Sequence, residues 1–318
     1  MDYYEGEREE MTGMKNALYG CFQKIVRLLW GTGLGKVPGA YAVHGFLFNL
    51  LQPGRDVIEV QGSKMYVNPR GLPQTFRRTF QSYIVSSGWE DMTTQMYKDV
   101  IREGDVVLDL GANIGYYTLL AARLAGPKGR VYAFEPEPLN YSLLLKNVEL
   151  NGYANVVAMQ QAVSDKLGTV KFFLDRENTG AHTMYQHEGT KGYIEVETVT
   201  MDDFFRDKGR RVDVIKMDIE GAEMAALAGM EGIIRDNDGI KIFMEFYFPG
   251  IERSGSSPEK FVRRLIDDYG FSVLAIGEYS RSKKSRKIGS AAELIELCDR
   301  KTANLFLQKE KGGSRQGK

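Results

Sequence analysis

One glycine-rich stretch decides the fold of this chain: DLGANIGYYT, residues 109–118. It overlaps the end of VVLDL (106–110), a run of branched apolar residues typical of a buried strand, and it leads into residues 116–124, which are apolar and helical in character. A glycine-bearing turn between a strand and a helix lets the backbone approach a ligand closely, and it points the helix N-terminus at that ligand. The stretch therefore predicts a cofactor loop in an α/β fold.

The spacing of the glycines selects between two classes of cofactor. A dinucleotide loop has the pattern G-x-G-x-x-G, but counting from Gly111 the third glycine position is occupied by Tyr116. The pattern D-x-G-x-N-x-G, which runs from Asp109 to Gly115, instead fits a loop that holds S-adenosylmethionine (SAM). Asn113 replaces the middle glycine, and asparagine is the residue besides glycine that best tolerates a left-handed backbone. The acid at the start of the pattern can hold the cationic methionine end of SAM, so the loop favours SAM over NAD.

The ends of the next two strands supply further candidate contacts. Glu135 ends VYAFE (131–135), 26 residues after Asp109, where a carboxylate can accept hydrogen bonds from both ribose hydroxyls. An acid at a strand end can also be merely solvated. The following strand is predicted over 155–163, and Ser164, directly after it, is placed to meet an adenine edge.

Strands and helices alternate through the rest of the chain. The further predicted elements are strands over 212–219, 240–247, 271–276 and 303–308, the last two forming a closing pair, and helices over 138–152, 222–230 and 258–269. Such alternation predicts a mostly parallel sheet with helices on both faces. Two segments, TVKFFL (169–174) and YIEVETV (193–199), interrupt the alternation and are predicted to form local β structure outside it.

Four motifs in this order resemble the FkbM family of SAM-dependent methyltransferases: VVLDLGANIGYYTLLAA, FEPEP, QAVSD and VIKMDIEGAE. The resemblance covers about residues 88–250. It implies a class I methyltransferase (Rossmann-like) fold with strand order 3-2-1-4-5-7-6, and transfer of a methyl group to a hydroxyl of a sugar, a glycan, or a polyketide- or lipid-like molecule. By motif position, it implies that the cofactor contacts are Asp109, Gly111, Asn113, Gly115, Glu135 and Ser164.

Methyl transfer to a hydroxyl needs a nearby group to take the hydroxyl proton. Strand alternation puts Lys216 and Asp218 on one face of the strand over 212–219, and Glu220 follows at the end where open α/β sheets bind ligands. Glu245 ends the neighbouring strand on the same edge. The lysine and its carboxylates are also compatible with a plain ion-pair network, but the resemblance to the family pattern K-x-D-x-E-G-x-E favours an active-site role.

A rival base is His182, in the polar loop NTGAHTMY (178–185). Histidine titrates near neutral pH, although most surface histidines take no part in catalysis. No histidine pair has HxxxH spacing, and no metal is required.

Two other readings stay open from the sequence. One is an NAD(P)-dependent oxidoreductase, which Tyr116 disfavours because a glycine is expected there. The other is a non-catalytic SAM-binding partner protein, which the intact loop and acidic residues disfavour. The identity of the acceptor and the oligomeric state are not readable.

Composition excludes several classes of protein. The chain has 42 basic and 42 acidic residues, whereas a nucleic-acid binder usually carries a basic excess. Two distant cysteines, Cys21 and Cys298, exclude a disulfide scaffold and a cysteine zinc site. The N-terminus is acidic, unlike a secretory signal, and no apolar run is long enough to span a bilayer. We expect a soluble, cytoplasmic protein.

The chain divides into three predicted parts. Residues 1–85 form an N-terminal extension, mainly helical with some β structure, residues 86–310 form the methyltransferase domain, and residues 311–318 form a disordered tail. A basic amphipathic stripe over 18–30 either packs on the core or makes weak contact with a membrane surface. The basic run RSKKSRK (281–287) is predicted to be a solvated hairpin loop.

Overall fold

The computed structural model describes most of the chain beyond residue 89. The described residues are 57–66, 90–176, 178–277, 284–299 and 301–309, with the single positions 18, 21, 22, 25 and 43. Most of the predicted extension and its stripe over 18–30, the tail over 311–318 and the first part of the basic run over 281–287 lie outside them.

The chain forms two compact units. The first contains Met1–Ile58 and Tyr66–Trp89, and the second contains Glu59–Met65 and Glu90–Lys318. Strands β1 (Val57–Val60) and β2 (Ser63–Tyr66) form a two-stranded sheet. The second unit carries the larger sheets, the pocket and every candidate site residue.

The main sheet has the strand order that the resemblance implies. Its strands are β3 (Val106–Leu110), β4 (Arg130–Phe134), β5 (Val156–Met159), β9 (Val214–Met217), β10 (Lys241–Tyr247), β11 (Phe271–Ala275), β12 (Arg286–Ile288) and β13 (Thr302–Lys309). They lie in the order β5-β4-β3-β9-β10-β13-β11-β12. The first five are parallel, while β13 runs antiparallel to both β10 and β11. Numbered along the chain without β12, the order is 3-2-1-4-5-7-6, and β12 adds an edge strand beside β11. The predicted fold class is confirmed.

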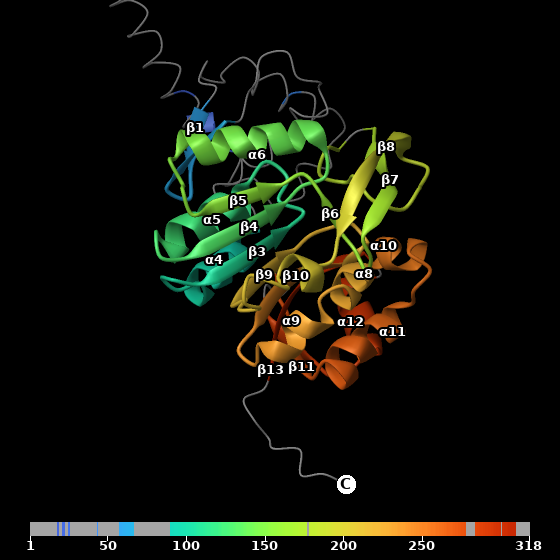
Figure 1. Cartoon of the computed structure of the whole chain (residues 1–318). Helices are drawn as coiled ribbons and strands as arrows, with labels where there is room; N and C mark the ends of the chain where they lie inside the picture. The colour runs from blue at the N-terminus through green and yellow to red at the C-terminus, as the bar shows by residue number, and fades with distance from the viewer. Residues whose placement is uncertain are drawn as a thin grey trace, which may run out of the picture. The chain divides into compact units, whose positions relative to one another are not determined.

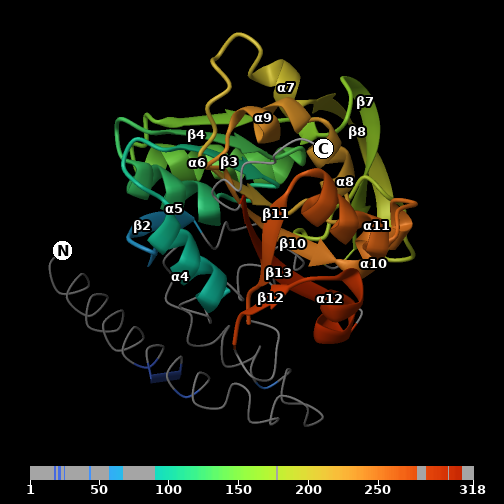
Figure 2. The same ribbon diagram turned by 90° about the horizontal axis from the view of Figure 1, so that it is seen from below.

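Helices cover both faces of this sheet (Figures 1 and 2). One face carries α4 (Asp91–Val100), α5 (Tyr116–Ala125) and α6 (Pro138–Leu150). The other elements are α7 (Met201–Phe204), α8 (Glu223–Ala228), α9 (Glu231–Asp236), α10 (Phe248–Arg253), α11 (Pro258–Arg263) with a π-helical turn after it (Arg264–Asp268), and α12 (Ala291–Cys298). The helix predicted over 222–230 is confirmed as α8, and α9 is a separate short helix that follows it. Among the described residues, no helix combines the length and the apolar composition that crossing a membrane requires.

The two faces of the sheet differ in polarity because side chains alternate along each strand. Leu108, Ile215 and Met217 point into the main apolar core, together with residues of α8, α9 and α11. The α4–α5 face instead buries Asp109 and Lys216, each 2% exposed. Buried charges are retained only with partners, so this face is the place to look for chemistry.

A separate small sheet has the order β6-β8-β7, with β6 (Ala162–Val163), β7 (Gly168–Asp175) and β8 (Thr190–Val199). β7 and β8 are antiparallel, as predicted for the inserted segments. The single strand predicted over 155–163 is wrong, because the chain leaves the main sheet after Met159 and continues as β6. Met159 is already level with Phe134, the last residue of β4, so the following residues have no strand to pair with there and β6 pairs with β8 instead.

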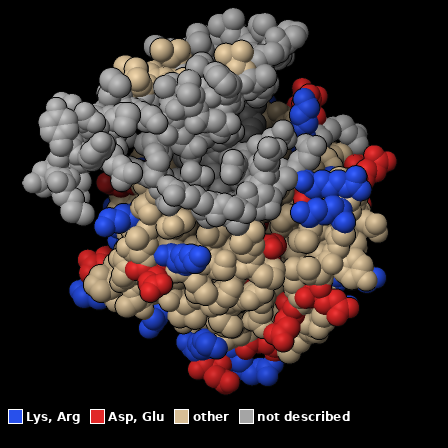
Figure 3. All heavy atoms as spheres, turned by 90° about the horizontal axis from the view of Figure 1, so that it is seen from above, with Lys and Arg blue, Asp and Glu red and all other residues tan. Residues whose placement is uncertain are grey.

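Basic and acidic side chains are interspersed on the described surface in Figure 3. This distribution agrees with the zero formal net charge.

Candidate active site

The loop between β3 and α5 has the backbone conformation that its sequence predicts. Gly111, Asn113 and Gly115 all have positive φ, at 83°, 50° and 100°. A Cβ on Gly111 would lie 1.9 Å from the carbonyl oxygen of Asp218. Only glycine therefore lets this turn pack against the end of β9, and the left-handed conformation predicted for Asn113 is confirmed.

Glu135 is held in one orientation by the main chain. It directly follows β4, is 5% exposed, and accepts N–H hydrogen bonds from Asn113 (Oε2, 2.8 Å) and Glu137 (Oε1, 2.9 Å). Burial raises the pKa of its carboxyl to about 7, although the two backbone hydrogen bonds lower it. Each carboxylate oxygen can accept two hydrogen bonds, so acceptor sites remain for the hydroxyls of a ligand.

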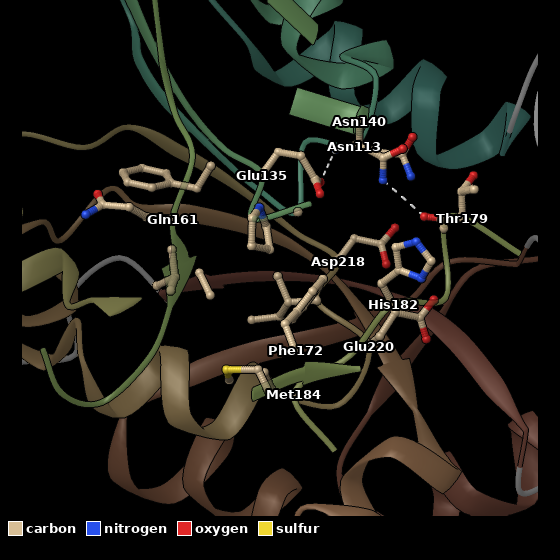
Figure 4. Close-up of a pocket in the computed structure, with 18 residues that line it drawn as sticks. Asn113, Glu135, Asn140, Gln161, Phe172, Thr179, His182, Met184, Asp218 and Glu220 are labelled. Carbon is tan, nitrogen blue, oxygen red and sulfur yellow. Dashed lines mark hydrogen bonds between the residues drawn. The ribbon is translucent and has the colours of Figure 1, made fainter. Parts of the chain in front are cut away.

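The loop and Glu135 line a pocket with about 510 Å³ of empty space that opens to solvent. Asp218 and Glu220, which follow β9, face into the same pocket (Figure 4). Residues of the small sheet line another side of it. The remaining lining residues are Phe134, Pro136, Asn140, Gln161, Ala162, Val163, Phe172, Thr179, Gly180, His182, Met184, Ile219 and Ala222.

Three predicted cofactor residues, Asp109, Gly115 and Ser164, lie outside this lining. Asp109 is buried behind it, where its Oδ2 accepts a 2.5 Å hydrogen bond from the Thr118 hydroxyl. Burial raises the pKa of Asp109 to about 6. The Ser164 hydroxyl donates to Asp165 Oδ1 at 3.1 Å. The three residues directly before Ser164, 161–163, line the pocket instead.

Sequence reasoning missed most of the contribution of the small sheet. Phe172 and Met184 bring apolar side chains to the pocket, and Thr179, in the β7–β8 connection, lies on the side of Asn140 (Figure 4). The inserted β segments were visible in the sequence, but their position over the pocket is set by long-range pairing. Asn140, in the first turn of α6, carried no sequence signal.

Lys216 and three carboxylates gather where β9 and β10 end. In the sheet register Lys216 lies between Asp109 of β3 and Phe243 of β10. Its Nζ is 3.1 Å from Asp218 Oδ2 and lies 4.9 Å from the centre of the Tyr117 ring. Carboxylate oxygens of Asp218, Glu220 and Glu245 all lie within 4.8 Å of one another. Such oxygens are ligands that divalent cations accept, although the Lys216 ammonium already compensates part of this negative charge.

The crowding of acids shifts their protonation. Burial, and then the charge of Glu245, raises the pKa of Glu220 well above its ordinary value. Burial, and then the charge of Asp218, does the same for Glu245, which accepts a 2.9 Å hydrogen bond from the Thr302 hydroxyl. Burial alone would lower the pKa of Lys216, but the Asp218 carboxylate outweighs burial and raises it. The cluster therefore combines a buried ammonium with two carboxyl groups, Glu220 and Glu245, that hold their protons more tightly than exposed carboxyl groups do.

His182 lines the same pocket close to Asp218 and Glu220 (Figure 4). Its Nδ1 accepts a 2.9 Å hydrogen bond from the Asp175 N–H. Burial, followed by the charge of Lys191, lowers the pKa of His182 to about 4. The ring is therefore neutral at pH 7, and because Nδ1 is the acceptor, the proton lies on Nε2. In this tautomer His182 offers the pocket a hydrogen-bond donor.

A family model described as the methyltransferase FkbM domain matches residues 109–273, just over half of the 318-residue chain. The chain belongs to the FkbM methyltransferase family. It is therefore an enzyme of the SAM-dependent methyltransferase class, and the oxidoreductase alternative is set aside.

Individual methyltransferases are also similar to part of the chain. Methyltransferase sdnD of Sordaria araneosa is 28% identical over 198 residues, covering 52% of this chain and 73% of that protein. The 31-O-demethyl-FK506 methyltransferase FkbM of Streptomyces tacrolimicus is 30% identical over 161 residues, covering 41% of this chain and 61% of that protein. The hexuronic acid methyltransferase AglP of Haloferax volcanii is 28% identical over 168 residues, covering 50% and 66%. A solved methyltransferase FkbM from Methylobacillus flagellatus covers 74% of this chain and 54% of its own, with 16% identity and a TM-score of 0.39.

Proposed function

We propose that this FkbM enzyme transfers a methyl group from SAM to a hydroxyl of a sugar, a glycan, or a polyketide- or lipid-like molecule. One observation carries the proposal: a single pocket joins an oriented Glu135 carboxylate on one wall to the Asp218 and Glu220 carboxylates on the other. The first wall fits the ribose of a nucleoside cofactor, and the second fits a hydroxyl that must lose a proton.

The pocket fits SAM by its hydrogen-bond acceptors and by the loop that lines it. Glu135 has acceptor sites to spare for the two ribose hydroxyls, and Gly111 and Asn113 bring the turned backbone of the loop to the pocket. We assign Asn113 and Gly115 to the backbone of this cofactor loop. Asp109 and Ser164 do not line the pocket. They would act indirectly, by fixing the position of the backbone next to the residues that contact the cofactor.

When bound, SAM supplies the methyl group, and the residues of the chain must position the acceptor and take its proton. We assign the proton to Asp218, because its side chain faces the pocket and is held there by the Lys216 Nζ, 3.1 Å from its Oδ2. Glu220, whose pKa is raised by burial and by the charge of Glu245, is the second candidate. The neutral His182 would orient the acceptor by donating from Nε2.

The acceptor class rests on the chemistry of the named relatives. One is named for 31-O-demethyl-FK506, one for hexuronic acid, and a third, from Sinorhizobium fredii, is a 2-O-methyltransferase, NoeI. The FkbM and NoeI names specify methylation at oxygen, and the AglP name specifies a sugar acid. Both agree with a pocket whose carboxylates can take a hydroxyl proton.

The proposal is tested in two steps. Calorimetry should detect binding of SAM and of its demethylated product S-adenosylhomocysteine (SAH), with no heat from NAD. A screen with labelled methyl groups over glycans and hydroxylated lipids or polyketides should then yield a labelled ether. Binding of SAH without transfer to any hydroxyl compound would favour a non-catalytic SAM-binding protein, and NAD binding without SAM binding would refute the cofactor assignment.

A further inference from the structure

Asn140 has one buried polar atom without a partner. It lies in the first turn of α6, is 1% exposed, and lines the pocket. Its Nδ2 donates a 3.1 Å hydrogen bond to the Thr179 carbonyl oxygen, whereas its Oδ1 has no hydrogen-bond partner among the described residues. A buried acceptor without a hydrogen bond costs free energy, so we expect a ligand to supply the missing donor.

The orientation of this amide is fixed by its neighbours. Rotating the side-chain amide by 180° would bring Oδ1 against the Thr179 carbonyl oxygen, and two acceptors would then face each other. The Asn140 amide is also close enough to the Glu135 carboxyl to lower its pKa. Asn140 therefore stands beside the wall where the ribose of the cofactor is proposed to bind.

The hydrogen bond to Thr179 connects Asn140 to the loop over 178–184, which spans the pocket. At the other end of this loop the Thr183 hydroxyl donates a 2.7 Å hydrogen bond to the carbonyl oxygen of Glu220. Glu220 itself has a left-handed φ of 53°, a conformation that costs a residue other than glycine free energy. His182 lies between the two attachments. The loop is thus attached to the cofactor wall at one end and to the proposed acceptor wall at the other.

We propose that Asn140 is a positioning residue that couples cofactor binding to this loop. Its Oδ1 accepts a hydrogen bond from a ribose hydroxyl of the cofactor, while its Nδ2 holds Thr179, so that the bound cofactor fixes the loop carrying His182. The acceptor then binds well only after SAM. This inference rests on the proposed function, because it takes SAM as the ligand of the pocket.

Hydrogen exchange of the 178–184 amides, with and without SAH, tests the coupling without a turnover assay. Three variants are compared with the unchanged protein. Asn140→Ala removes both halves of the connection, and Asn140→Asp keeps an acceptor oxygen but removes the donor to Thr179. Asn151→Ala is the matched control, because Asn151, at the other end of α6, also donates to backbone carbonyls and does not line the pocket.

We expect SAH to slow exchange in the loop at least about tenfold in the unchanged protein and in Asn151→Ala, the scale of one ordered hydrogen bond. At saturating SAH, both Asn140 variants should lose this slowing. Asn140→Ala should also weaken SAH binding about tenfold, whereas Asn140→Asp should weaken it less. Once a methyl acceptor has been identified, its KM should rise in both Asn140 variants more than kcat falls.

Each result decides the matter. Unchanged SAH-dependent slowing in a folded Asn140 variant overturns the coupling, as does SAH binding to the unchanged protein with no effect on the loop. An equal loss in Asn151→Ala assigns the effect to general loosening of α6 and also overturns it. Failure of the unchanged protein to bind SAH at all refutes the proposed function instead. Melting temperatures confirm folding, and the unchanged protein alone tests the inference if neither Asn140 variant folds.

Discussion

Replacement of Glu135 by glutamine, measured across pH, tests whether its carboxylate binds the cofactor ribose. Burial raises the pKa of Glu135 to about 7, so the free protein carries it largely protonated at pH 6 and largely ionised at pH 8. Only the ionised form keeps every acceptor site for hydroxyl donors. A ligand that needs the ionised form therefore loses affinity as the pH falls through 7.

The magnitude follows from the fraction that is competent to bind. With a pKa of about 7, that fraction is roughly 0.9 at pH 8 and roughly 0.1 at pH 6, so the apparent Kd for SAH should rise about tenfold between them. At pH 8, Glu135→Gln should cost about 1.5 to 3 kcal/mol of SAH binding, the scale of a hydrogen bond to a charged group. The glutamine also offers only one acceptor oxygen to the N–H groups of Asn113 and Glu137, which Glu135 now satisfies together.

Titration calorimetry of SAH at pH 6, 7 and 8 measures both effects. The unchanged protein should show the tenfold trend, and Glu135→Gln should bind weakly with a nearly flat pH profile. Asp109, with a pKa of about 6, also titrates in this window, so the flat profile of the variant is the decisive result. An unchanged Kd in a folded variant, or a pH trend that survives the substitution, would refute the role of Glu135.

Three further predictions separate the other parts of the site. Asp218→Asn should lower kcat at least about 100-fold while SAH affinity stays within a few-fold, and Glu220→Gln should do so only if Glu220 is the base; a parallel loss of SAH binding would place Asp218 in the cofactor site. His182→Ala should raise KM for the acceptor more than it lowers kcat, and complete loss of turnover with intact acceptor binding would make His182 the base. Gly111→Ala should abolish SAH binding and lower the melting temperature more than Gly104→Ala, which has a similar φ of 86° but no atom within 4 Å of the added Cβ and should cost about 1 to 2 kcal/mol; equal melting temperatures would contradict the close approach at Gly111.

The local geometry of the proposed cofactor site was readable from the sequence alone. The conformation of the loop from Gly111 to Gly115 depends on which residues tolerate positive φ, and that is a property of the residues themselves. Glu135 follows β4 and Asp218 follows β9, and both strands are parallel members of the main sheet. Their shared edge follows from the alternation of strands and helices, because parallel strands end at the same edge.

Only the tertiary structure decided how these residues share the pocket. Asp109 lies behind the lining, where Thr118 donates a hydrogen bond to it, and residues 161–163 line the pocket in place of Ser164. The free Oδ1 of Asn140 depends on where a distant loop places the Thr179 carbonyl. The pKa values of the acids depend on burial and on the charges of groups distant in sequence. Both depend on all the atoms that folding brings near each acid, so no local sequence pattern encodes them.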